Sequence, residues 1–167
     1  MLLRTGGSVR RCRVLVADQH DLWRGYTVAK FNLFGADVRQ AVDGLEAMVL
    51  AYAEPFDIIV LDADLPDCPM AEALAAIRSE PSRSRGAVVA CQRAGSARAA
   101  LAAGFDRGLE RPARASELMD LYARAQVRCD AAQAEVGRAV GAAGGGVVRS
   151  DGGGATSPGL RPDTGQP

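Results

Sequence analysis

The chain has 167 residues, of which 48% are hydrophobic, and its 20 basic and 20 acidic side chains give a formal net charge of zero. This length and apolar content are sufficient for one domain with a hydrophobic core, while the balanced charge provides no general attraction for nucleic acid. Because no apolar run approaches the roughly 20 residues that span a membrane, and because residues 1–11 lack the apolar segment of a signal peptide, we predict a cytoplasmic protein.

Short apolar runs rich in β-branched residues alternate with segments of helical spacing. The runs that predict strands are residues 13–17, 36–41, 58–61, 87–91 and 105–110. The segments that predict helices are residues 22–34, 45–53, 69–79, 96–103 and 115–128. Five such alternations indicate a parallel sheet with helices on both of its faces.

Helical periodicity also predicts which side chains face the core. These residues are Leu22, Tyr26, Phe31, Phe34, Leu45, Met48, Val49, Met70, Leu74, Ile77, Leu118, Leu121 and Ala125.

The domain is predicted over residues 12–128, after a disordered lead-in over 1–11. A possible helix extension over 129–140 precedes residues 141–167, which hold nine of the 19 glycines. This composition predicts a disordered tail, with a docking peptide as the alternative.

The most informative stretch is FDIIVLDADLP, residues 56–66. Its apolar part is bounded by two prolines and is typical of a strand buried on both faces. Asp62 stands at the end of this strand, and Asp18 ends the first predicted strand in the same way. Because open α/β sheets carry their chemistry at the carboxyl ends of the strands, both carboxylates are candidates for a functional site.

The cysteines are widely spaced along the chain, at Cys12, Cys68, Cys91 and Cys129. They form no C-x-x-C pair and no Cys/His pattern, which are the spacings typical of zinc sites. The sequence therefore predicts neither a zinc site nor a disulfide framework, and we expect reduced thiols.

Five local patterns resemble the receiver domain of two-component response regulators, in the order in which that family has them. They are VLVADQHDLWR, AVDGLEAM, FDIIVLDADLP, AAIR and AAGFDRGLERP. The resemblance spans residues 13–126. It implies an α/β fold of the flavodoxin-like kind, with a five-stranded parallel sheet in the order 2-1-3-4-5 and helices on both faces.

The resemblance also implies a site. By position, Asp62 is the phosphoacceptor, which takes a phosphoryl group from a phosphohistidine on a partner. Asp18, Gln19, Asp62 and the backbone carbonyl of Asp64 are the implied ligands of Mg²⁺. Since Gln19 replaces an acidic residue, we expect Mg²⁺ to bind weakly.

Other positions depart from the family pattern as well. The implied phosphoryl contacts are Cys91, a weak donor where the family has threonine or serine, and Arg111, which replaces a lysine. The aromatic switch residue of the family is Gly108 here and has no ring. As in the family, we expect the Arg111-Pro112 peptide bond to be cis.

His20, the only histidine, follows Asp18 by two positions. The pair matches the start of a D-x-H-x-x-G cobalamin-binding motif, but Trp23 stands where that motif has its glycine, and its ring would block the loop. We therefore expect His20 to be an exposed loop residue.

Two functions stay open at this stage, and neither is enzymatic. The first is a stand-alone receiver that accepts a phosphoryl group on Asp62 from a histidine kinase or a phosphotransfer protein and signals to a further protein, without nucleic acid or membrane. The second is a degenerate receiver that binds a protein partner without phosphorylation, with Asp62 held permanently by Arg111.

Overall fold

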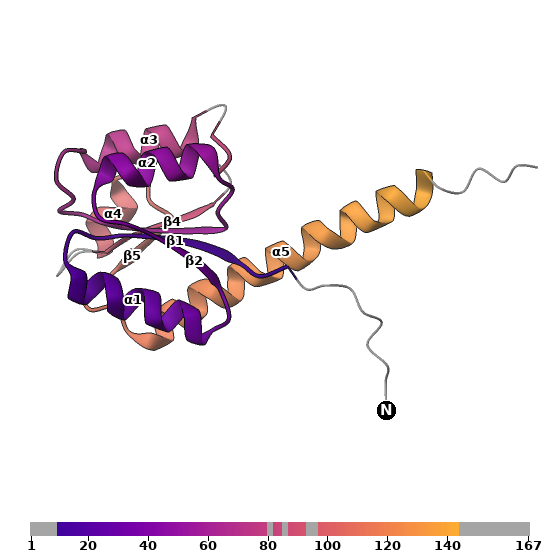
Figure 1. Ribbon diagram of the computed structural model, residues 1–167, viewed down its shortest axis with the longest axis horizontal. Helices are drawn as coiled ribbons and strands as arrows, with labels where there is room; N and C mark the ends of the chain where they lie inside the picture. The colour runs from indigo at the N-terminus through magenta and orange to yellow at the C-terminus, as the bar shows by residue number, and fades with distance from the viewer. Residues whose placement is uncertain (1–9, 80–81, 85–86, 93–96, 144–167) are drawn as a thin grey trace, which may run out of the picture.

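The computed structural model describes residues 10–79, 82–84, 87–92 and 97–143. The predicted lead-in up to residue 9 and the predicted tail from residue 144 lie outside the described residues. Figure 1 shows a layered domain from which one long helix projects.

The strands form one parallel sheet in the order β2-β1-β3-β4-β5. Their bounds are β1 Arg13–Ala17, β2 Asp37–Ala41, β3 Ile58–Asp62, β4 Val88–Gln92 and β5 Arg107–Leu109. This order confirms the predicted α/β fold with sheet order 2-1-3-4-5. The central strand β3 is buried along all five residues, as expected for a strand that helices cover on both faces.

The helices cover the two faces of this sheet (Figure 1). Their bounds are α1 Asp21–Leu33, α2 Gly44–Ala53, α3 Met70–Arg78, α4 Ala97–Ala102 and α5 Ala115–Ala143. Helices α2, α3 and α4 share one apolar core with Leu15 and Ile59 of the sheet. Helices α1 and α5 share the other with Val14 and Val60. The two cores arise because successive residues of a strand point to opposite faces.

The predicted core face of α2 is wrong for two of its three residues, while the third, Met48, is partly buried and packs against the apolar core. Leu45 and Val49 are 59% and 58% exposed, whereas Gly44 and Ala47 are buried. The start of α2 lies close to the loop before α3, where a Cβ on Gly44 would be only 2.3 Å from the Cβ of Cys68. A helix that packs so closely against its neighbour buries its small residues. The prediction considered only whether a residue is apolar, and not its size, so it selected the larger residues instead.

The predicted face of α1 is correct from Tyr26 onward, since Tyr26 and Phe34 also pack against the core, and it is wrong at its start. Phe31 is fully buried, but Leu22 is 73% exposed. Leu22 lies in the first turn of α1, and the first buried residue of this helix is Thr27. The first turn of α1 therefore lies beyond the apolar core.

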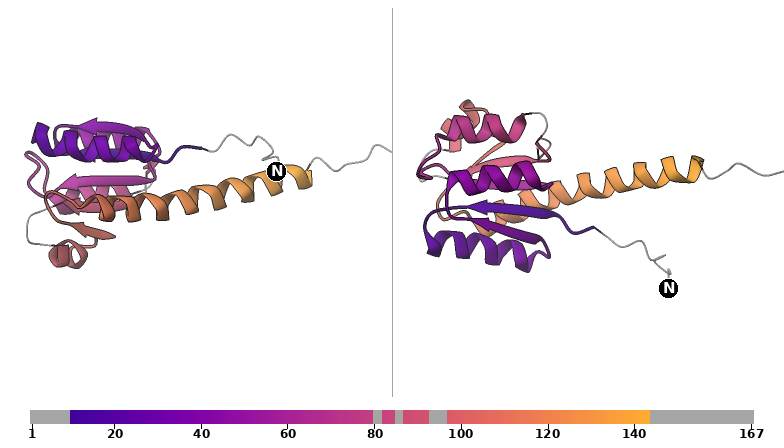
Figure 2. Two further views of the ribbon diagram at one scale, coloured as in Figure 1. Left: turned by 90° about the horizontal axis from the view of Figure 1, so that it is seen from below. Right: turned by 45° about the horizontal axis from the view of Figure 1, so that its top comes forward.

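Helix α5 is much longer than the domain needs. Leu118, Leu121 and Ala125 are buried against the sheet, as predicted, and Cys129 is the last buried residue of the helix through residue 139. The helix continues to Ala143 and projects away from the sheet in both views of Figure 2. Within the described part of the chain, no helix has the length and apolar character needed to cross a membrane.

Candidate functional site

Asp18 and Asp62 lie at the same edge of the sheet. Strands β1 and β3 are neighbours, with Ala17 opposite Leu61 in their register, so the residues that follow in the two strands come together. Asp18 and Asp62 are only 2% and 1% exposed. Two buried carboxylates repel one another unless donors or cations compensate their charge.

Each carboxylate is only partly satisfied by the described residues. Asp62 Oδ1 accepts a hydrogen bond from the Asp64 N–H at 3.3 Å and forms an ion pair with Arg111. Asp18 Oδ1 accepts a hydrogen bond from the His20 backbone N–H at 2.8 Å. The second oxygen of each, Oδ2, is buried and has no hydrogen-bond partner within the described ranges. Since an unsatisfied buried acceptor costs about 1–3 kcal/mol, the two oxygens favour a cation at this edge.

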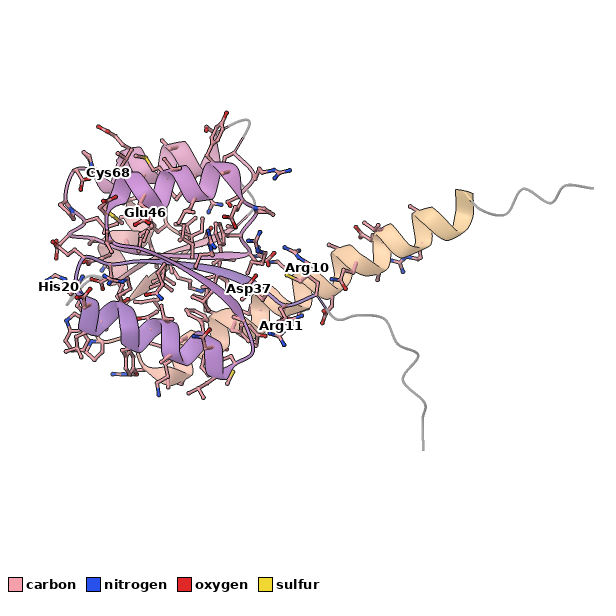
Figure 3. All side chains as sticks on the ribbon, viewed as in Figure 1. Arg10, Arg11, His20, Asp37, Glu46 and Cys68 are labelled. Carbon is pink, nitrogen blue, oxygen red and sulfur yellow. The ribbon has the colours of Figure 1, made fainter. Side chains whose placement is uncertain are left out.

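His20 is exposed, as predicted, but it is also part of the site. Its Nδ1 lies 3.2 Å from Asp18 Oδ1 and 3.8 Å from Asp62 Oδ2. Figure 3 shows His20 at the sheet edge where α1 begins. The hydrogen bond from the His20 N–H to Asp18 turns the chain back on itself, which is a common use of an aspartate side chain. The D-x-H spacing was therefore a usable signal, although not for cobalamin.

Gln19 is hydrogen-bonded to the loop that follows β3. Its Nε2 donates a hydrogen bond to the backbone carbonyl of Asp64 at 2.6 Å. Two of the predicted Mg²⁺ ligands therefore bond to each other. The Asp64 carbonyl oxygen has a second lone pair, so it can bind a metal ion while it accepts this hydrogen bond.

Arg111 supplies the positive charge of the site. Its peptide bond to Pro112 is cis, as predicted, and its side chain is largely buried, with 13% exposure, in the ion pair with Asp62. Arg111 Nε is buried without a hydrogen-bond partner among the described residues. The guanidinium thus keeps donor capacity while it compensates the charge of Asp62, since its Nη2, which forms the ion pair, is also without a hydrogen-bond partner among these residues.

Cys91, the implied phosphoryl contact, and Gly108, the position of the family's aromatic switch residue, lie on strands β4 and β5. Cys91 is in β4, opposite Leu61 of β3 and Gly108 of β5, but its side chain is outside what the structure describes. At Gly108 a Cβ would lie 2.3 Å from both Cα and O of Ala97. The start of α4 therefore occupies the space into which a side chain at position 108 would extend, and this packing requires glycine.

Gln92 was not singled out from the sequence, yet it belongs to the site region. It ends β4, lies opposite Asp62 in the register, and is 1% exposed. Its Nε2 is buried and has no hydrogen-bond partner in the described part of the chain. A polar residue at the end of a buried strand was the signal that could have identified it, as it identified Asp62.

The donor set fits a divalent metal ion. Asp18, His20 and Asp62 each offer one ligand atom, and these atoms lie within 4.8 Å of one another. Carboxylate oxygens suit Mg²⁺, and an imidazole suits transition metals such as zinc. The structure thus brings together Asp18 and Asp62 of the predicted set and adds His20.

Comparisons with known proteins identify the family. The family model of the response regulator receiver domain matches residues 14–123, which is more than half of the chain. No curated protein matches the chain. The chain therefore belongs to the response regulator receiver family.

Solved structures show the same fold. The chain is similar to the receiver domain of the Francisella response regulator 1452, with 26% identity and a TM-score of 0.62 over 71% of this chain and 98% of that one. It is similar to the receiver domain of the sensor histidine kinase PA1611 from Pseudomonas aeruginosa, described with a magnesium ion in its active site cleft, with 21% identity and a TM-score of 0.63 over 70% and 98% of the chains. It is also similar to the Saccharomyces cerevisiae Ssk1 receiver domain, crystallised with the histidine phosphotransfer protein Ypd1, with 18% identity and a TM-score of 0.59 over 70% and 89%.

Proposed function

We propose that this receiver accepts a phosphoryl group on Asp62 from a phosphohistidine of a histidine kinase or phosphotransfer protein in the cytoplasm. It then signals through protein–protein contacts, as a signalling module and not as an enzyme. The observation that carries the proposal is the set of unsatisfied buried atoms. The acceptors Asp18 Oδ2 and Asp62 Oδ2 suit a cation, and the donors Arg111 Nε and Gln92 Nε2 suit an anion.

The transfer needs a carboxylate that is ionised and accessible to phosphorus. An oxygen of Asp62 attacks the phosphorus atom of the phosphohistidine, and an oxygen–phosphorus bond forms while the nitrogen–phosphorus bond breaks. The bond electrons return to the imidazole of the donor, which takes up a proton. Arg111 then exchanges part of its ion pair with Asp62 for the phosphoryl oxygens, since a guanidinium can bind phosphate with two parallel donors.

Asp18, His20 and Asp62 are the residues that would hold a divalent ion. Such an ion neutralises charge on the carboxylates and on the transferred phosphoryl group. Mg²⁺ prefers oxygen ligands in an octahedral arrangement, and Gln19 contributes no charge to it. We therefore infer weak Mg²⁺ binding, with His20 favouring ions that accept nitrogen, such as Zn²⁺ or Ni²⁺.

The readout of this receiver differs from the aromatic switch of the family. Gly108 has no ring, and the backbone of Ala97 fills the adjacent space. Phosphorylation adds close to two negative charges beside Asp62. We infer that this charge acts on a partner through Arg111 and the loops at the carboxyl edge.

Phosphorylation by a small-molecule donor tests the proposal without the cognate kinase. The full chain is incubated with phosphoramidate and Mg²⁺ or Mn²⁺, and its intact mass is measured. We expect one added phosphoryl group in the wild type and in Asp64→Asn, the matched change two positions away, and none in Asp62→Asn. A wild type that stays unmodified, or an Asp62→Asn variant that is modified to the same extent, would contradict the proposal.

A second candidate function has its own support in the structure. The pairs Arg111–Asp62 and Gln19–Asp64 satisfy part of the site from within the chain, as in a receiver that binds its partner without phosphorylation. Capture of the interacting protein by wild-type and Asp62→Asn chains, each with and without phosphoramidate, separates the two functions. Equal capture in all four samples supports the binding module, and capture that changes only in the phosphorylated wild type supports the switch.

A further inference from the structure

Two cysteines that lie far apart in the sequence meet at the edge of the sheet opposite the phosphoacceptor. Cys12 comes directly before β1, Cys129 lies in α5, and Asp57 comes directly before β3. One ligand atom from each of the three residues lies within 4.8 Å of the others. The two sulfur atoms are buried, at 0% and 4% exposure of their residues.

The three side chains already interact with one another. The negative charge of Asp57 acts on both thiols, and the two thiols also act on each other. Burial, followed by the Asp57 carboxylate, raises the pKa of Cys129 to about 11, and the same two causes in the same order raise the pKa of Cys12. Both thiols are therefore protonated at neutral pH, and a bound cation would have to displace their protons.

We propose that Cys12, Cys129 and Asp57 form a binding site for a zinc ion. Two thiolates and a carboxylate are ligands that zinc accepts in tetrahedral sites, with zinc–sulfur bonds of about 2.3 Å. Ligand atoms that already lie within 4.8 Å of one another need only small side-chain movements to reach such a geometry. Thiolates also exclude Mg²⁺, which selects oxygen.

The surroundings complete the site. Arg10 lies 3.2 Å from Asp57 through its Nη2. Two thiolates and one carboxylate carry three negative charges, which the two charges of zinc and the one of Arg10 balance. A groove of about 300 Å³ reaches the site from outside. Its lining includes Arg10, Asp57, Arg128 and Cys129. It provides an entry path and room for a water molecule as the fourth ligand.

Zinc at this position would clamp α5 to the sheet. Cys129 is the last buried residue of α5 through residue 139, so the site lies where the helix leaves the domain. Figure 3 shows Arg10 beside α5 at this point, at the opposite end of the sheet from His20. The bound ion would fix the direction of the projecting part of α5.

Cobalt binding tests the proposal, since Co²⁺ replaces Zn²⁺ and absorbs in the near ultraviolet when a thiolate binds it. The full chain is kept reduced, freed of metal with a chelator, and titrated with Co²⁺. We expect thiolate-to-cobalt absorption that saturates at one equivalent and disappears when Zn²⁺ is added. A wild-type chain without this absorption at saturating Co²⁺ overturns the proposal and needs no variant.

Single serine substitutions then assign the ligands. Cys12→Ser and Cys129→Ser are expected to lose most of the absorption, while Cys68→Ser, a change of another buried cysteine away from the site, keeps it. His20→Ala also keeps it, because the Asp18, His20 and Asp62 site contains no sulfur. Absorption that survives in Cys12→Ser, or that is lost only in Cys68→Ser, overturns the assignment. The circular dichroism spectrum of each metal-free variant establishes that it is folded before it is titrated.

Discussion

Asp62 and Arg111 determine at the residue scale how this receiver can work. The carboxylate is buried and its Oδ1 is paired with the guanidinium. The positive charge of Arg111 reduces the repulsion between Asp62 and Asp18, which is one of the effects that a bound metal ion would have. Arg111 and a divalent ion bound as proposed would therefore compete for the same carboxylate.

Neutralising Arg111 should consequently strengthen metal binding. We expect Arg111→Gln to bind Mg²⁺ about tenfold more tightly, since an opposite charge near a carboxylate commonly shifts its affinity for a cation by an amount of this order. Titration of the amide NMR spectrum with Mg²⁺ measures the affinity. Arg39→Gln is the matched control, because Arg39 pairs with Glu54 at an exposed position away from the site. An unchanged affinity in Arg111→Gln would show that the ion pair does not restrain the site.

One strand and one helix explain at the element scale why position 108 is glycine. The backbone of Ala97 at the start of α4 lies where a Cβ on Gly108 of β5 would be, at 2.3 Å. Since backbone atoms cannot move aside as the end of a flexible side chain can, β5 and α4 have to separate when any side chain is introduced. Glycine at position 108 therefore explains two features at once: it allows α4 to pack closely on β5, and it leaves this position without the aromatic ring that the family has there.

Gly108→Ala should thus be destabilising although alanine is small. We expect a loss of about 1–3 kcal/mol in the free energy of unfolding, the usual cost of overpacking, measured by urea denaturation. Gly25→Ala is the matched control: Gly25 lies within α1, and a Cβ there would meet no atom within 4 Å. That change should stabilise the helix by up to about 1 kcal/mol. Equal stability of the two variants would contradict the packing argument.

At the scale of the whole molecule, the sheet carries polar clusters at both ends, and they contain different chemical groups. The carboxyl edge has Asp18, His20 and Asp62, which provide oxygen and nitrogen. The amino edge has Cys12, Asp57 and Cys129, which provide sulfur and oxygen. The first cluster serves the proposed phosphoryl transfer, and the second lies where α5 leaves the domain.

The amino-edge cluster also predicts a dependence of stability on pH. The pKa of Cys129 rises from its ordinary value of 9.0 to about 11 in the folded chain, mainly by burial. Between these values the unfolded chain has released this proton while the folded chain retains it, so the free energy of unfolding falls as pH increases from 9 to 11. Urea denaturation across this range should show a smaller decrease for Cys129→Ser than for the wild type. A decrease of the same size in both would mean that Cys129 does not contribute.

The sequence by itself determined the order of strands and helices, the family, and the positions of Asp18 and Asp62 at strand ends. These features depend on local periodicity and on short patterns, which are read along the chain. Tertiary structure alone decided that Cys12 meets Cys129, because residues from different elements approach only when the sheet and α5 pack together. It likewise decided which face of α2 is buried, since the distance between two packed elements, and not hydrophobicity alone, selects the size of the residues between them.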